Sequence, residues 1–74
     1  MSVLPVLAAR EVMRRLTRAG FFHIKTQGSH YIFLNPKTDR VTSVPLHGGK
    51  DIGRGLLGKI LKQADISVEE FLNL

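Results

Sequence analysis

This 74-residue chain contains three histidines, whose usual pKa allows the imidazole to exchange a proton near neutral pH. His30 has the most suggestive surroundings, because it follows Gly28 and Ser29 in the stretch QGSHYIFL, where an apolar segment begins. At such a position the backbone of a substrate could approach closely, and the imidazole could transfer a proton to or from it. Position alone leaves an equal alternative, a structural histidine whose ring nitrogens are hydrogen-bonded in the core or across strands.

Basic residues are expected around this histidine. An imidazole can take the proton of a ribose 2′-hydroxyl or protonate the leaving 5′-oxygen. Together with cations that stabilise the charge on the phosphate, this is sufficient for cleavage of RNA by transphosphorylation. Neither a metal ion nor another cofactor is required, and none is expected. With His30 as the candidate catalytic group, the residues expected to contact RNA are Lys25, Ser29, Lys50, Arg54 and Lys59.

The other two histidines are less informative. His23 is expected on the solvent-facing side of a strand, together with Lys25. His47 lies in a glycine-rich loop, where it could contact a phosphate group or simply cap the loop. The sequence leaves both roles open.

Charge and composition restrict the class of protein. Eleven Lys and Arg against six Asp and Glu give a net charge of +5, and residues 1–62 alone carry +8. Such a basic body favours a polyanion as partner. There is no cysteine, and no HExxH, P-loop or dinucleotide-binding pattern occurs. The apolar start of the chain is short and is interrupted by Pro5, so a cytoplasmic protein without a signal peptide or membrane span is expected.

The hydrophobic pattern predicts one α+β domain over residues 1–74. A helix is predicted over 8–19, followed by antiparallel strands at 21–26, 29–34 and 40–44, with Gln27–Gly28 as the first hairpin turn. Residues 45–55 contain four glycines and are interpreted as a loop, and helices are predicted over 55–64 and 67–74. The expected fold has two layers, with the helices on one face of a three-stranded sheet.

Side-chain spacing assigns a buried face to each element. In the strand over 21–26, Phe22 and Ile24 share one face, and His23 and Lys25 share the other. The apolar sides of the two longer helices are expected to consist of Ala8, Val12, Leu16 and Ala19, and of Leu56, Leu57, Ile60, Leu61 and Ala64. In the last helix, Phe71 and Leu72 are expected to point inward.

Helix-end signals support these boundaries. Gly20 stands where a left-handed residue would end the first helix, and Glu11 can pair with Arg15 one turn later. Ser67 and Glu70 have the spacing of a capping box. Gly58 costs about 1 kcal/mol relative to Ala inside a helix, so close packing or a ligand is expected there.

Three motifs occur in an order that resembles the HicA-like (YcfA-like) family of small mRNA interferase toxins. They are Gly-Ser-His at 28–30, Val-Pro-Leu-His-Gly at 44–48 and the run from Gly55 to Ala64, and the similarity extends from Leu4 to Leu72. The resemblance implies a double-stranded-RNA-binding-domain-like fold, metal-independent cleavage of mRNA with His30 as the catalytic residue, and a HicB-type antitoxin as partner. The chain departs from the pattern at 8–9 and 53–54, where Ala-Ala and Gly-Arg replace the commoner Ser-Gly and Lys-Pro.

Two functions therefore have to be separated. The first is an endoribonuclease toxin that uses His30. The second is a non-catalytic RNA-binding module on the same fold, in which basic helix faces clamp an A-form duplex and His30 only packs. A protein-interaction module that does not bind RNA would leave the excess of positive charge without a role.

Overall fold

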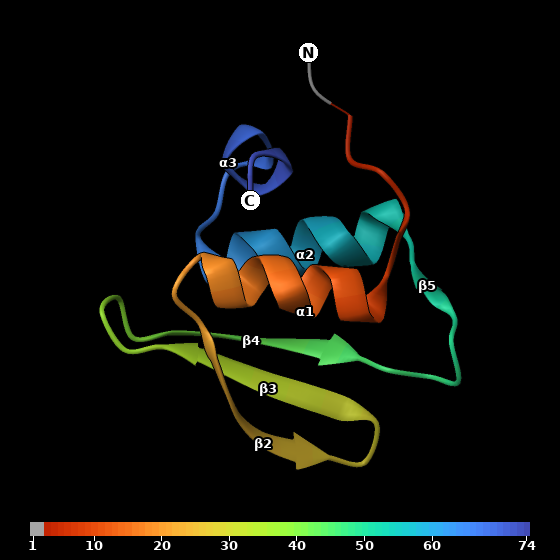
Figure 1. Ribbon diagram of the computed structural model, residues 1–74, viewed down its shortest axis with the longest axis horizontal. Coiled ribbons are helices and arrows are strands. Elements are labelled where there is room, and N and C mark those ends of the chain that lie inside the picture. The colour runs from red at the N-terminus through yellow and green to blue at the C-terminus, as the bar shows by residue number, and fades with distance from the viewer. Residues whose placement is uncertain (1–2) are drawn as a thin grey trace.

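The computed structural model describes residues 3–74 and shows a two-layer α+β protein (Figure 1). Helices α1 and α2 lie side by side on one face of an antiparallel sheet, so the predicted fold class and the order helix, three strands, helix are confirmed. Residues 1 and 2, with which the predicted domain begins, lie outside the described part. The elements are β1 Leu7–Ala8, α1 Ala9–Arg18, β2 Phe22–Gln27, β3 His30–Asn35, β4 Arg40–Pro45, β5 Asp51–Ile52, α2 Arg54–Ala64 and α3 Val68–Leu72.

The main sheet has the order β2-β3-β4, with β3 in the centre as its apolar sequence indicates. The first hairpin pairs Gln27 with His30, so its two turn residues are Gly28 and Ser29. The predicted turn was therefore placed one residue too early. Gly28 has a φ of +60° and Ser29 has a negative φ, the order of signs found in a type II′ turn, where glycine avoids the steric cost at the first position.

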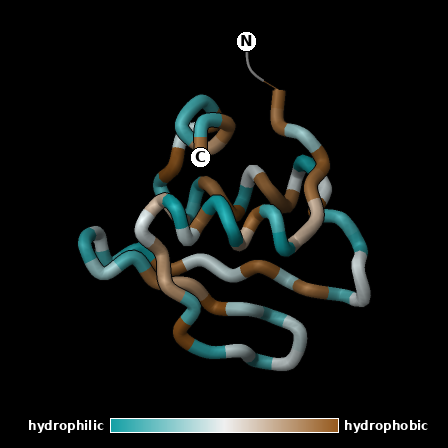
Figure 2. The backbone as a smooth tube through the Cα atoms, in the orientation of Figure 1, coloured by the Kyte–Doolittle hydropathy of each residue, from teal (hydrophilic) through white to brown (hydrophobic). Residues whose placement is uncertain are grey.

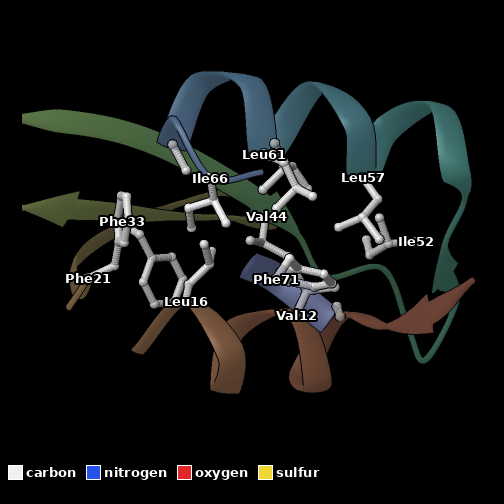
Figure 3. Packing of buried hydrophobic residues seen from close by; sticks show 13 residues of the cluster. Val12, Leu16, Phe21, Phe33, Val44, Ile52, Leu57, Leu61, Ile66 and Phe71 are labelled. Atoms are coloured by element: carbon white, nitrogen blue, oxygen red, sulfur yellow. The ribbon is translucent and has the colours of Figure 1, made fainter. Parts of the chain in front are cut away.

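The core lies between the sheet and the helices, and a third helix closes one side of it (Figure 3). From α1 it receives Val12 and Leu16, as the spacing predicts, but Ala9 is buried in place of Ala8. The buried hydrophobic residues are Ala9, Val12, Leu16, Phe21, Phe33, Val44, Ile52, Leu57, Ile60, Leu61, Ala64, Ile66 and Phe71.

The predicted faces of β2 are wrong, because the strand contains a β-bulge. Its pairing with β3 shifts between His23 and Lys25, which leaves Ile24 as the extra residue. One extra residue reverses the alternation, so His23 and Lys25 lie on opposite faces. Phe22 and Ile24 are 61% and 50% exposed, and the buried aromatic residue is Phe21, just before the strand.

A second, two-stranded sheet was not predicted. β1 pairs with β5, with Leu7 opposite Ile52 and Ala8 opposite Asp51. The segment interpreted as a loop over 45–55 thus contains the end of β4, the whole of β5 and the start of α2. This pairing ties the glycine-rich segment to the start of α1.

The helical ends largely follow the sequence signals. Gly20 has a φ of +101°, Glu11 accepts a hydrogen bond from Arg15 at 2.8 Å, and the Ser67 hydroxyl accepts one from the Glu70 amide at 3.0 Å. Glu11 also accepts hydrogen bonds from Arg14. These two guanidinium groups, first that of Arg14 and then that of Arg15, lower the pKa of the Glu11 carboxyl to about 2.

Three expectations about the helices are corrected. Leu56 and Leu72 were expected inside but are 40% and 39% exposed, so each lies at the edge of the buried face of its helix. A Cβ atom at Gly58 would meet only Leu4 Cδ1, at 3.9 Å, so close packing does not require the glycine. Hydrophilic and hydrophobic residues alternate along both longer helices, as expected for helices with one buried and one exposed face (Figure 2). The β3–β4 turn is mostly hydrophilic.

Candidate functional site

One end of the molecule collects most of the candidate residues. The β2–β3 turn, the end of β4, the segment from 46 to 50 and the first residues of α1 and α2 all lie at the right of Figure 1. Both helices therefore direct their N-terminal, partially positive ends toward this side. We describe it as the hairpin end, defined by residues 27–30, 45–50 and the starts of α1 and α2.

His30 is held at this end by the backbone on both sides. It is the first residue of the central strand and is paired with Gln27 of β2 and with Pro45 of β4. Its side chain is exposed, which does not match a histidine packed in the core. A fixed backbone with an accessible ring is the arrangement that proton transfer to a bound substrate requires.

His47 lies next to His30. The two ring centroids are 6.0 Å apart and the ring planes are perpendicular. The segment that carries His47 is tied to the hairpin, because the Leu46 amide donates a hydrogen bond of 2.7 Å to the Ser29 carbonyl. Two imidazoles thus share the hairpin end, although they are far apart in the sequence.

Lys25 and Ser29 flank this pair. Lys25 is paired with Ile32, two residues after His30 on β3, so Lys25 and His30 lie on the same face of the sheet, on adjacent cross-strand rows. This is the face that the helices leave open. Ser29 is half-buried in the turn and directly precedes His30.

A cavity of about 360 Å³ is lined by residues that precede and follow His47 in the sequence. Lys50 of the loop and Arg10 of α1 supply its cations. The N-cap residue of α1 is Ala8, and its side chain makes no hydrogen bond to the first amides of the helix. These amides therefore lack a side-chain cap, at a position where Ala-Ala replaces the commoner Ser-Gly. Cations and helix-end amides are groups that bind phosphate oxygens. The complete lining is Ala8, Ala9, Arg10, Leu46, Gly48, Gly49 and Lys50.

The remaining two predicted RNA-binding residues are placed differently. Arg54 begins α2 at the hairpin end and is exposed, but its Nε donates a hydrogen bond of 2.7 Å to the Leu4 carbonyl and so holds the N-terminal segment. Lys59 lies in the middle of α2, in the helix layer on the other side of the sheet from Lys25. The structure therefore does not gather all the predicted cations into one patch around His30.

His23 belongs to the helix-facing side of the sheet. Its ring stacks on Tyr31 with centroids 5.0 Å apart and lies 5.6 Å from the ring of Phe33. Its Nε2 and the Thr26 hydroxyl share a hydrogen bond of 2.8 Å. These contacts give His23 a structural role at an exposed edge strand, on the face opposite to His30.

Sequence reasoning missed Arg10 and did not assign His47. No local pattern places Arg10 beside Lys50, because the pairing of β1 with β5 brings the two residues together. For His47 the available signal was its place in the Val-Pro-Leu-His-Gly motif directly after a strand. Within residues 3–74 no three His, Cys, Asp or Glu side chains gather as a metal site, and no helix is long and apolar enough to cross a membrane.

The fold and the hairpin end define a small basic α+β protein with accessible imidazoles beside cations, features typical of proteins that act on nucleic acids. Residues 9–66 match the family described as HicA toxin of bacterial toxin-antitoxin systems. The chain belongs to the HicA toxin family. HicA toxins are generally ribonucleases and pair with antitoxins. No curated protein matches the chain.

Proposed function

We propose that this chain is a cytoplasmic toxin that cleaves mRNA without a metal ion, with His30 as its catalytic residue. The observation that carries the proposal is the placement of an exposed imidazole at the first residue of the central strand, with the ring of His47 6.0 Å away. Membership of a family whose members are generally ribonucleases supports it.

The proposed chemistry uses the RNA itself as the source of the nucleophile. The ribose 2′-oxygen attacks the neighbouring phosphorus, the bond to the 5′-oxygen breaks, and the products carry a 2′,3′-cyclic phosphate and a 5′-hydroxyl. His30 takes part in the proton transfers, which contribute about 10²–10⁴-fold to such reactions. Lys25 and Lys50 would stabilise the charge that develops on the phosphate, and Ser29, Arg54 and Lys59 are retained as proposed RNA contacts.

A HicB-type antitoxin is the proposed protein partner. Residues 1–62 carry a net charge of +8, so a partner with an acidic surface would be attracted to this part of the toxin. Covering the hairpin end would keep RNA away from His30. Co-purification with an acidic protein encoded next to the toxin gene tests this part of the proposal, and a toxin that is fully active in the presence of that protein would contradict it.

Cleavage is tested by comparing His30→Gln with the parent on single-stranded mRNA in EDTA. We expect the parent to produce fragments with cyclic-phosphate ends and the variant to lose about 10²-fold or more of that activity. His23→Gln is the matched control, because it makes the same substitution at an exposed histidine on the other face of the sheet. Circular dichroism shows whether both variants remain folded.

Two results would contradict the proposal. A folded His30→Gln protein that cleaves as fast as the parent would remove His30 from catalysis. A parent that binds RNA in a salt-sensitive manner but yields no fragments would instead support the non-catalytic RNA-binding module.

A further inference from the structure

Backbone contacts of the hairpin end bring two imidazoles close together. His30 is fixed by strand pairing on both sides, to Gln27 and to Pro45. Within residues 3–74 neither ring makes a side-chain hydrogen bond, and the centroids are 6.0 Å apart. The rings are therefore close enough to face one bound group, and no hydrogen bond joins them to each other.

His47 is held although its side chain is exposed. On its N-terminal side, Leu46 packs against the core and its amide is bound to the Ser29 carbonyl at 2.7 Å. On its C-terminal side, the Lys50 amide donates to the His47 carbonyl at 2.9 Å, across Gly48 and Gly49, whose positive φ values of +52° and +86° form the turn. Glycine accepts these angles without strain, so the turn stabilises the position of the His47 backbone.

The proposed cleavage requires two proton transfers on opposite sides of the phosphorus. The 2′-hydroxyl loses its proton as its oxygen attacks, and the leaving 5′-oxygen gains a proton as its bond to phosphorus breaks. A single ring would have to take the proton on one side of the phosphorus and then deliver it on the other side, in two successive steps. Two rings that face the same phosphate from different directions can serve both sides in one step.

We propose that His47 is the second catalytic residue of the site, so that His30 and His47 act as an acid–base pair on an RNA phosphodiester. This inference rests on the proposed function. One ring, neutral at the outset, takes the 2′-hydroxyl proton, and the other ring, protonated at the outset, gives its proton to the 5′-oxygen. No proton is gained or lost overall, and exchange with water restores the two starting states.

The charged groups at or near the hairpin end come from several elements. Lys25 lies on β2 on the same sheet face as His30, Lys50 and Asp51 lie in and after the loop, and Arg10 and Arg54 lie at the starts of the two helices. Because cations predominate, they favour binding of the phosphate and of the negative charge that it develops during the reaction.

The pair is tested by pH–rate profiles of His47→Gln and the parent, on an RNA with a single cleavable linkage. The parent is expected to give a bell-shaped profile with one limb from each imidazole. His47→Gln is expected to lose about 10²-fold or more of kcat and one limb of the bell, and His30→Gln the other limb. His23→Gln is the control and should keep the rate and both limbs.

A substrate whose leaving 5′-oxygen is replaced by sulfur separates the two roles, because a thiolate leaves without being protonated. The variant that lacks the acid should approach the parental rate on this substrate, and the variant that lacks the base should not. In His47→Ala, added imidazole is expected to restore part of the activity, an effect that a merely structural role would not produce.

The outcomes distinguish this inference from the proposed function. If His30→Gln is inactive but His47→Gln keeps both limbs and loses less than about tenfold of kcat, the pair is refuted and His30 acts alone. Failure of the sulfur substrate to rescue either variant also refutes the pair. If the parent does not cleave RNA, or His30→Gln cleaves normally, the proposed function itself fails and the pair fails with it.

Discussion

Replacing Phe71 with alanine is expected to undo the attachment of α3 and to destabilise the protein severely. The ring is completely buried, with 0% exposure, and the Arg15 guanidinium lies 5.0 Å from its centroid. Arg15 Nη1 also donates a hydrogen bond of 3.3 Å to the Phe71 carbonyl. Deleting a buried phenylalanine costs about 3–5 kcal/mol of unfolding free energy. The lost cation–π contact adds about 0.5–1 kcal/mol.

This cost is large against the total. A chain of 74 residues is expected to have an unfolding free energy of about 4–11 kcal/mol, so the variant should lose about a third of it or more. For a domain of this size, 1 kcal/mol shifts Tm by about 4–8 °C, and we therefore expect Phe71→Ala to lower Tm by at least about 12 °C. Phe71→Leu, which keeps the position apolar, should lie between the variant and the parent.

The matched control is Leu72→Ala, one residue further along the same helix. Leu72 is 39% exposed, so its truncation should shift the unfolding free energy by only about 0.5 kcal/mol. Thermal unfolding followed by circular dichroism measures both variants under the same conditions. Equal Tm shifts for Phe71→Ala and Leu72→Ala would refute the packing of α3 described above.

Three further predictions concern stability and RNA binding. Gly58→Ala should raise the unfolding free energy by about 0.8–1.0 kcal/mol, because the new methyl group meets only Leu4 Cδ1 at ordinary distance; a lower Tm in a thermal scan would contradict this. Glu11 has its pKa lowered from 4.5 to about 2, so its contribution to stability is complete above pH 4.5 and is lost as the pH falls toward 2. Urea titrations at several pH values should show less acid sensitivity over that range in Glu11→Gln than in the parent, and identical profiles would count against the ion pairs. Lys50→Gln, in the cavity beside Arg10, should reduce the salt slope of single-stranded RNA binding by about 0.7 per lost phosphate contact, and Lys59→Gln should change it less. Fluorescence anisotropy over a salt series measures both, and a larger effect of Lys59→Gln would place the RNA on the helix layer instead.

Much of the fold could be predicted because the strongest signals are local. The apolar spacing of Val12 and Leu16, the left-handed Gly20 and the Ser67 cap each depend on neighbours within one or two helical turns. The errors occur where a local rule has an exception that the sequence does not mark. The bulge at Ile24 reverses the faces of β2, so that Phe22 is exposed and His23 stacks on Tyr31.

The candidate site was predicted in part. His30 lies at the start of the central strand, where the hairpin places it, and its side chain is exposed. The predicted set of cations is less compact than expected, because Arg54 holds Leu4 and Lys59 belongs to the helix layer. Which of these residues contacts RNA stays a prediction that the variants above test.

The sequence by itself determined the type and order of the main elements, the basic character of the chain and the family motifs. It could do so because periodicity, turn residues and charge are properties of short segments or of the whole composition. Only the tertiary structure decided that His47 lies 6.0 Å from His30 and that Arg10 and Lys50 line one cavity. Both arrangements depend on backbone hydrogen bonds between distant segments, the Leu46–Ser29 bond and the β1–β5 pairing, and such long-range pairings leave no periodic trace in the sequence.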